Sequence, residues 1–231
     1  MTRLSRYAVF LFLLVALHVD AAEINGYVLL TTDYVYRGVS HSDEHGAAQI
    51  GVDVDFESGF YAGVWGSTID IGGGTPRQRD REVNYYLGYS YDVSRRWSIG
   101  TNAVAYAFPG AKGTIDYDYV EYSLTANYDD RFWIEYGRSP DLYHTGTETA
   151  FVSLYTTWSL GKRYDLGAGI GVYDVSELVG DDYSFWEFGV TRLFGKLALD
   201  LRYHDSSRWL RIISNQDTAD ARLVLTARFQ F

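Results

Sequence analysis

The chain contains no cysteine, only three prolines and one methionine, and its positive charges are outnumbered by negative ones. Without cysteine it cannot form disulfides, on which small exported domains usually depend. Its 20 basic and 30 acidic residues give a net charge of −10, and this sign argues against nucleic acid as a partner. Beyond the first 21 residues, no apolar run approaches the ~20 residues of a membrane-spanning helix. Something other than cross-links or transmembrane helices must therefore define the fold.

The first 21 residues have the pattern of a secretory signal peptide. Arg3 and Arg6 form a basic segment, and residues 7–17 form an apolar run of eleven residues. Val19 and Ala21 are the small residues that precede a cleavage site. We predict that residues 1–21 are removed on export and that residues 22–231 form the mature domain. The alternative is a retained N-terminal anchor.

Aromatic residues are abundant, with 21 Tyr, 12 Phe and 6 Trp, and apolar side chains alternate with polar ones along most of the chain. In residues 49–57, for example, Ile50, Val52, Val54 and Phe56 occupy every second position. This period of two is that of a β-strand with one apolar face, and no stretch predicts a helix. Twelve such segments can be recognised, at about 26–37, 47–57, 60–71, 81–92, 97–108, 116–128, 131–139, 148–160, 163–174, 183–193, 196–205 and 220–231.

The connections between these segments alternate in length. Short turns are expected at 58–59, 93–96, 129–130, 161–162 and 194–195, and longer polar loops at 38–46, 72–80, 109–115, 140–147, 175–182 and 206–219. Outer-membrane barrels have an even number of strands, short periplasmic turns and longer outward loops, and aromatic girdles at both interfaces. Closure is required because hydrocarbon leaves unpaired backbone groups unsatisfied. We therefore predict an all-β, antiparallel up-and-down transmembrane β-barrel of about 12 strands. In segment 60–71 the apolar face is ambiguous, because Val64 and Trp65 compete for it.

Two short sequences go beyond this general pattern. The first predicted strand runs into Tyr-Val-Tyr-Arg-Gly-Val-Ser at 34–40, and the chain closes on Phe229 and Phe231. The first sequence resembles the TorF-like porin family, proteobacterial outer-membrane proteins of unknown function, although His41 stands where a glutamine is expected. The second resembles the signal that outer-membrane proteins present to the barrel-assembly machinery. The resemblance covers most of the mature chain. It implies an outer-membrane location and a porin-like role, with lipid and that machinery as partners.

Candidate sites for other chemistry are weak. His41, Asp43, Glu44 and His45 form a cluster, but such loops are more often solvated than metal-binding, so we predict no metal site. The Gly-x-Gly-x-Gly run at 167–171 lies within a strand rather than before a helix, which argues against a nucleotide cofactor. We expect these glycines to face the lumen and to leave room for long side chains from opposite strands, or for water.

A lipid hydrolase is the remaining enzymatic alternative, because some outer-membrane lipases are twelve-stranded barrels. Ser139 and His144 share a predicted loop, and Ser206 follows His204. No third residue that would orient the histidine is visible in either pair. We therefore predict that the protein is not an enzyme.

The alternation also predicts which charged residues line the lumen. Ten acids and four arginines fall on the inward face, which predicts a preference for cations if the lumen conducts. The alternative is a plugged structural or adhesive barrel whose loops bind a partner, since twelve strands lie between a filled and an open barrel. The predicted lumen residues are Asp33, Arg37, Asp53, Asp55, Glu57, Glu82, Glu121, Glu135, Asp165, Glu187, Asp200, Arg202, Arg222 and Arg228.

Overall fold

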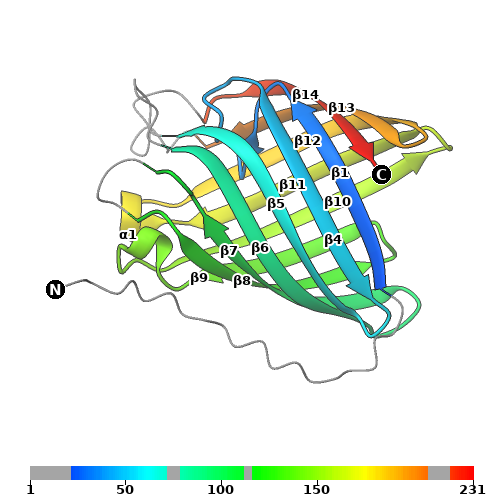
Figure 1. Ribbon diagram of the computed structural model, residues 1–231, viewed down its shortest axis with the longest axis horizontal. Helices are drawn as coiled ribbons and strands as arrows, with labels where there is room; N and C mark the ends of the chain where they lie inside the picture. Colours follow the sequence, from blue (N-terminus) through cyan, green and yellow to red (C-terminus); the bar gives the residue numbers. More distant parts are fainter. Residues whose placement is uncertain (1–21, 72–78, 112–115, 208–218) are drawn as a thin grey trace.

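A computed structural model describes residues 22–71, 79–111, 116–207 and 219–231. The expected signal peptide and parts of three long loops lie outside these described residues. Twelve antiparallel strands form a closed barrel, which confirms the predicted fold class (Figure 1). The wall strands are β1 (Ala22–Thr31), β4 (Ala47–Phe56), β5 (Phe60–Ile71), β6 (Arg79–Asp92), β7 (Trp97–Ala107), β8 (Tyr119–Tyr128), β9 (Phe132–Ser139), β10 (Thr149–Leu160), β11 (Tyr164–Asp174), β12 (Tyr183–Phe194), β13 (Leu197–Ser206) and β14 (Arg222–Gln230).

Each wall strand pairs with the next one in the chain, and β1 closes the barrel by pairing with β14. The short turns lie at one end of the barrel, here called the short-turn end. The other end, the long-loop end, carries the one-turn helix α1 (Ser176–Val179) and the 3-10 turn η1 (Leu142–His144). Neither helix was expected from the sequence. No helix of the described residues is long and apolar enough to cross a membrane.

The first predicted strand is wrong in its bounds, whereas the other eleven agree with the structure to within three residues at each end. The wall strand β1 ends at Thr31 instead of continuing to residue 37. Two short strands, β2 (Val35–Tyr36) and β3 (Val39–Ser40), then form a separate two-stranded sheet. Part of the predicted outward loop 38–46 therefore belongs to this hairpin.

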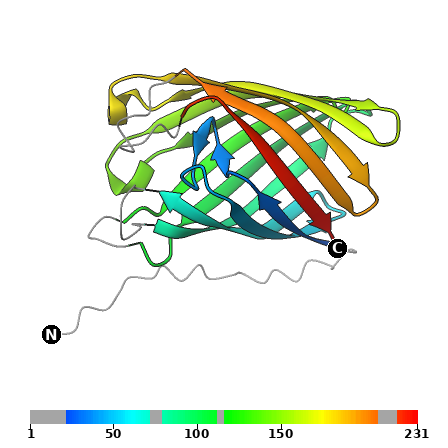
Figure 2. The ribbon, with the colours of Figure 1, turned by 90° about the horizontal axis from the view of Figure 1, so that it is seen from above.

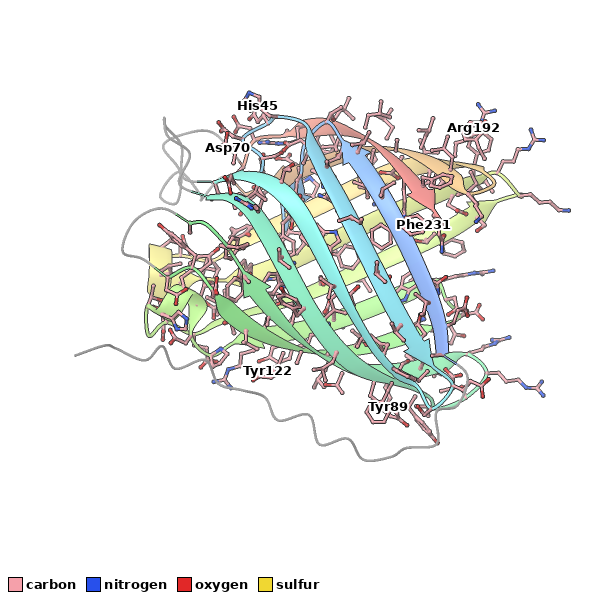
Figure 3. The ribbon with its side chains drawn as sticks, in the orientation of Figure 1. His45, Asp70, Tyr89, Tyr122, Arg192 and Phe231 are labelled. Carbon is pink, nitrogen blue, oxygen red and sulfur yellow. The ribbon has the colours of Figure 1, made fainter. Side chains whose placement is uncertain are left out.

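The two faces of the wall differ as the alternation predicts. Large apolar side chains such as Leu30, Leu87 and Ile170 are exposed on the outer face, where lipid would cover them. Tyr122 also points away from the barrel (Figure 3). The ambiguity in β5 is resolved, because Val64 is 45% exposed on the outside and Trp65 packs against Tyr34 inside.

Glycines on the inner face make room for rings from neighbouring strands. The ring of Phe151 on β10 lies over Gly137 of β9, and that of Phe185 on β12 lies over Gly171 of β11. A Cβ atom at either glycine would collide with the ring. The expected role of the glycines is thus corrected in one respect: the rings come from adjacent strands rather than from across the lumen, and the side chain of Arg202 near Gly167 comes from β13, two strands away.

The seam between β1 and β14 is the shortest ladder of the wall, with five register pairs from Tyr27 to Thr31 against ten between β1 and β4. Phe231 extends the seam by one further residue. Its N–H donates to the Gly26 carbonyl (2.8 Å), the Gly26 N–H donates back (3.3 Å), and its ring covers Gly26. The last residue of the chain therefore helps to close the barrel.

Deleting Phe231 should lower the amount of barrel in the outer membrane of cells far more than it lowers the stability of refolded protein. In the folded state one interfacial ring contributes only about 1–3 kcal/mol, whereas the resemblance to the assembly signal implies a larger role in biogenesis. Membrane levels and in-vitro refolding yield measure the two effects separately. Phe231→Tyr serves as the matched control and should behave like the wild type. Equal losses in both assays would contradict the prediction.

Candidate functional site

The hairpin β2–β3 forms its own two-stranded sheet and lies inside the barrel, where its two short strands are drawn in blue (Figure 2). Its register pairs Val35 with Ser40 and Tyr36 with Val39, which leaves Arg37 and Gly38 as a two-residue turn. Both turn residues have positive φ, 49° and 80°, as in the type I′ turns that suit a twisted hairpin. A positive φ disfavours arginine by about 1–2 kcal/mol. Contacts at the tip must therefore hold Arg37 in this conformation.

Arg37 forms a bidentate ion pair with Glu121 of β8, through Nη1–Oε2 (2.9 Å) and Nη2–Oε1 (2.7 Å). Its guanidinium carbon also lies 3.5 Å from the ring centroid of Phe151 and 4.8 Å from that of Tyr173. The two charged side chains are only 7% and 5% exposed. Although burial lowers the pKa of Arg37, the neighbouring Tyr36 and Glu121 raise it well above its ordinary value. Arg37 is thus a permanent cation locked to the far wall.

Gly38 brings the backbone of the tip against the same wall. A Cβ atom here would lie 2.8 Å from the Cβ of Phe185 and 2.9 Å from the Cβ of Ser206, on β12 and β13. The tip of the hairpin therefore contacts β12 and β13 through Gly38, in addition to β8 and β10 through Arg37.

At the base of the hairpin, the buried carboxylate of Asp33 gathers three donors. It accepts hydrogen bonds from the hydroxyls of Ser40 (2.6 Å) and Ser42 (2.8 Å). Arg222 of β14 donates to its other oxygen at 2.8 Å. This network ties the two legs of the hairpin to each other and to the wall.

Aromatic contacts hold one side of the hairpin. The hydroxyls of Tyr36 and Tyr106 share a hydrogen bond of 2.8 Å, and the ring of Tyr34 packs edge-on against Trp65 at 5.4 Å. Burial raises the pKa values of Tyr34 and Tyr36 well above the ordinary range, so both hydroxyls stay neutral. Below them Glu82, 1% exposed, accepts a hydrogen bond from Asn84 (2.9 Å) and faces Nδ1 of His41 at 3.4 Å.

Two apolar clusters pack around the hairpin at the long-loop end. One packs Val39 of the hairpin against residues of β10, β11 and β12, and the other packs Tyr34 and Tyr36 against residues of β5, β7 and β8. The buried members are Phe151, Tyr173, Val175, Tyr183, Phe185 and Ala219 in the first cluster, and Ile69, Tyr106, Phe108, Tyr119 and Leu142 in the second. The hairpin and the two clusters thus pack against one another at the long-loop end of the lumen.

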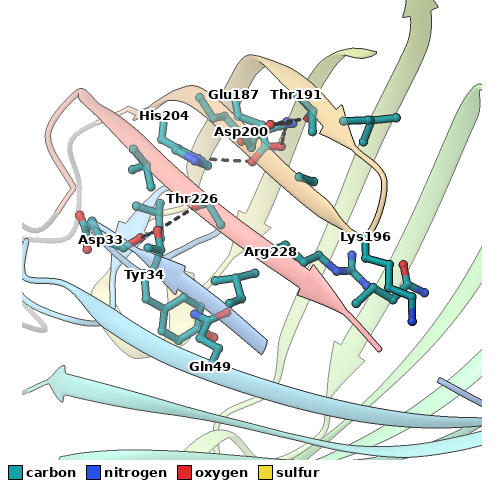
Figure 4. Close-up of a pocket in the computed structure, with 18 of the residues that line it drawn as sticks. Asp33, Tyr34, Gln49, Glu187, Thr191, Lys196, Asp200, His204, Thr226 and Arg228 are labelled. Carbon is teal, nitrogen blue, oxygen red and sulfur yellow. Dashed lines mark hydrogen bonds and ion pairs between the residues drawn. The ribbon is translucent and has the colours of Figure 1, made fainter. Parts of the chain in front are cut away.

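Toward the short-turn end, the lumen contains a cavity of about 570 Å³ between β1, β4, β12, β13 and β14 (Figure 4). Arg202 crosses its wall, with Nη1 2.7 Å from Glu187 and Nε 3.2 Å from Asp200. Nδ1 of His204 lies 3.3 Å from Glu187. The cavity lining thus combines charged and polar side chains with apolar ones such as Leu29 and Val224.

The structure brings thirteen of the fourteen predicted lumen residues to the interior. Asp33 and Arg37 belong to the inward segment rather than to the wall strand expected for them. Glu57 is an error of prediction: β4 ends at Phe56, and Glu57 lies exposed in the turn that the Gly59 N–H closes on the Phe56 carbonyl (2.9 Å). The wall residues on the inner face are Asp53, Asp55, Glu82, Glu121, Glu135, Asp165, Glu187, Asp200, Arg202, Arg222 and Arg228.

Sequence reasoning missed the aromatic side chains that seat the hairpin, above all Tyr34, Trp65 and Tyr106. One signal could have found the hairpin itself. The predicted strand 26–37 and its continuation to residue 40 are too long for one crossing of ~9–11 residues, and they contain an Arg-Gly pair at a turn position.

The residues considered for other chemistry mostly have partners of their own. His41 faces Glu82, and Glu44 lies 3.4 Å from Arg222. Within the described part of the chain, no group of three potential ligands could hold a metal ion. The Ser206 hydroxyl donates to the Ala219 carbonyl (2.9 Å), and the buried Ser139 hydroxyl has no hydrogen-bond partner among the described residues.

Comparisons with known proteins agree with this architecture. The model of a family described as "Bacterial protein of unknown function (Gcw_chp)" matches residues 19–225, whereas the TorF-like name is not confirmed. No curated protein matches the chain in sequence.

Solved structures show the same fold. The barrel is similar to a KdgM porin (TM-score 0.57, 9% identity, 91% of this chain and 99% of that chain). It is also similar to a NanC porin (0.58, 10%, 90% and 99%) and to a TodX deltaS2S3 mutant monoaromatic hydrocarbon channel (0.51, 11%, 91% and 89%). These neighbours are named as porins or as a channel, and at 9–11% identity the likeness shows the barrel fold.

Proposed function

Because this chain belongs to the Gcw_chp family of bacterial proteins of unknown function and has a porin-like fold, we propose that it is an outer-membrane channel for the passive diffusion of small solutes, with a preference for cations. The observation that carries the proposal is a cavity with charged and polar side chains inside a closed barrel. The hairpin β2–β3 narrows the path at the long-loop end, so passage depends on its displacement. No cofactor or catalytic role is proposed. The partners are membrane lipid, the barrel-assembly machinery during biogenesis, and the solutes.

The charge of the lumen supports the cation preference. Without Glu57, the predicted set contains nine acids and four arginines, an excess of five negative charges. Arg37 pairs with Glu121, Arg222 with Asp33, and Arg202 with both Glu187 and Asp200. The acids that have no arginine partner among the described residues are Asp53, Asp55, Glu82, Glu135 and Asp165. Carboxylates facing a bore favour cations through their field.

Reversal potential across a salt gradient measures this preference in refolded protein inserted in planar bilayers. We expect stepwise currents and a cation-selective reversal potential, which should shrink as added salt screens the lumen charges. Replacing both Asp53 and Asp55 by asparagine should weaken the selectivity, whereas Glu57→Gln in the exposed turn should leave it unchanged. A zero or anion-selective potential in the open wild-type channel would refute the cation preference.

The location can be tested independently of conduction. Mature protein should fractionate with the outer membrane, give a β-type circular dichroism spectrum in detergent, and migrate differently on gels before and after heating. These properties follow from a barrel whose outer face is apolar and whose edges are closed. Recovery in the soluble periplasmic fraction would refute the membrane location.

A plugged structural or adhesive barrel is the second candidate, and the buried contacts of the hairpin favour it. In that case the outward loops, rather than the lumen, would carry the function. Silent bilayers with well-folded wild-type protein, and equally silent bilayers with a variant whose hairpin is released, would support this candidate over the channel.

A further inference from the structure

Arg228 takes part in none of the ion pairs described above for the lumen. It lies on β14 and lines the cavity together with Lys196, Gln49 and Gln230 (Figure 4). In the described part of the chain, no carboxylate lies within ion-pair distance of Arg228 or Lys196. The other three arginines of the predicted lumen set each pair with at least one carboxylate.

Among the described residues, the guanidinium of Arg228 is positioned by stacking on an aromatic ring. Its central carbon lies 4.2 Å from the ring centroid of Tyr27. The ring of Tyr27 is in turn fixed, because it lies flat over Gly51 of the next strand. A guanidinium that stacks by its face keeps the N–H donors at its edge free, and these form a fork that matches the two oxygens of a carboxylate. Arg228 is therefore oriented for an anion without being bonded to one.

The acids that line the cavity do not compete for this fork. Glu187 and Asp200 are both paired with Arg202, and Asp33 is paired with Arg222. The five acids without an arginine partner lie on β4, β6, β9 and β11, outside the cavity lining. Arg228 and Lys196 therefore carry positive charges that no ion pair of the described residues uses, although the three acids and three basic residues that line the cavity balance and the lumen as a whole carries an excess of acids.

We propose that this cavity is a binding site for small carboxylate-bearing solutes, with Arg228 as the bidentate anchor and Lys196 as a second positive charge. The Gln49 and Gln230 amides line the same cavity and supply donors and acceptors for the polar remainder of the solute. A volume of about 570 Å³ is within the range of ~300–1,000 Å³ typical of small-molecule sites. The inference rests on the proposed function because the cavity is part of the solute path. It concerns the solute held at this site, whereas the proposed cation preference concerns the salt ions that carry current through the lumen.

Calorimetric titration of refolded barrel in detergent, at low salt, tests the site without requiring conduction. Glucuronate and glucose are the probes, because they have similar size and differ in the carboxylate. We expect glucuronate to bind roughly tenfold or more tightly than glucose, as a charge-assisted bidentate pair implies. Arg228→Gln should abolish this difference in affinity. Arg228→Lys should retain only part of it, because lysine lacks the two parallel N–H donors of the guanidinium.

Arg192→Gln is the matched control and should leave glucuronate binding unchanged. Arg192 also stacks on rings, with its guanidinium carbon 4.5 Å from the centroid of Phe194, but it does not line the cavity. Equal binding of the two sugars, no effect of Arg228→Gln, or inorganic phosphate binding as tightly as glucuronate would each overturn the proposal. A barrel that conducts but does not bind glucuronate would refute this inference and leave the proposed channel intact. A barrel that binds glucuronate but gives no current in planar bilayers would refute only the proposed channel.

Discussion

Arg37→Ala should raise the single-channel conductance of the refolded barrel several-fold. The substitution removes the bidentate pair at the tip of the hairpin and leaves the Glu121 carboxylate, 5% exposed, without its counter-ion. An unpaired buried charge destabilises a structure by about 3–5 kcal/mol. Water can relieve this penalty only if the hairpin moves away from β8. Conductance in planar bilayers, recorded together with heat-modifiable migration to verify the fold, measures the effect.

Two further variants separate release of the hairpin from loss of charge. Combining Arg37→Ala with Glu121→Gln removes both charges, so it should leave the hairpin better seated than the single change. Arg138→Ala breaks the exposed pair with Glu148, whose side chains are about half exposed. Such surface pairs contribute only about 0–1 kcal/mol, so conductance should not change. Wild-type conductance in a folded Arg37→Ala barrel would show that the tip does not hold the hairpin.

Gly38→Val should open the lumen without changing its charge. Valine is disfavoured at the φ of +80°, by about 1–3 kcal/mol, and its Cβ would meet the Cβ atoms of Phe185 and Ser206 at less than 3 Å. The hairpin tip can accommodate neither effect while it rests against the wall. We expect a conductance at least as high as that of Arg37→Ala. The reversal potential per open channel should stay close to that of the wild type.

Gly161→Val provides the matched control for backbone strain alone. Gly161 also has a positive φ, +72°, but no atom lies within 4 Å of the position that its Cβ would take. This turn lies at the short-turn end, away from the hairpin, so the variant should lose some stability and keep the wild-type conductance. Equal conductance in the two valine variants would contradict the role assigned to the tip.

Most of the barrel wall could be predicted from the sequence, because the alternation of apolar and polar side chains that marks a wall strand is a local property of the sequence. A strand between lipid and lumen must alternate, so Ile50, Val52 and Val54 reveal both the strand and its faces. The ends of strands could also be predicted where glycine or aspartate marks the turn that follows. Glu57 was misplaced because it continues the alternation by one residue into the turn after Phe56.

The hairpin could not be predicted from the same signal. Tyr34, Val35 and Tyr36 suit a strand whether it lies in the wall or inside the barrel, so alternation alone cannot distinguish the two. The turn pair Arg37–Gly38 lacks the usual Asn-Gly signature, and its conformation depends on Glu121, which is far away in the sequence. Likewise, Trp65 can face the lumen because Tyr34 is there to cover it, and this is a property of the folded molecule.

The attachment of the inward segment also limits how it can move. Residues 32–46 leave the wall at Thr31 and return to it at Ala47, and these two residues are register partners in the β1–β4 ladder. Both legs therefore depart from one point on the wall, and the segment can only pivot about that point. An aperture would open eccentrically, along β8 to β13. Because a tethered segment stays at a high effective concentration near its seat, closure should be reversible and independent of how much protein the membrane contains.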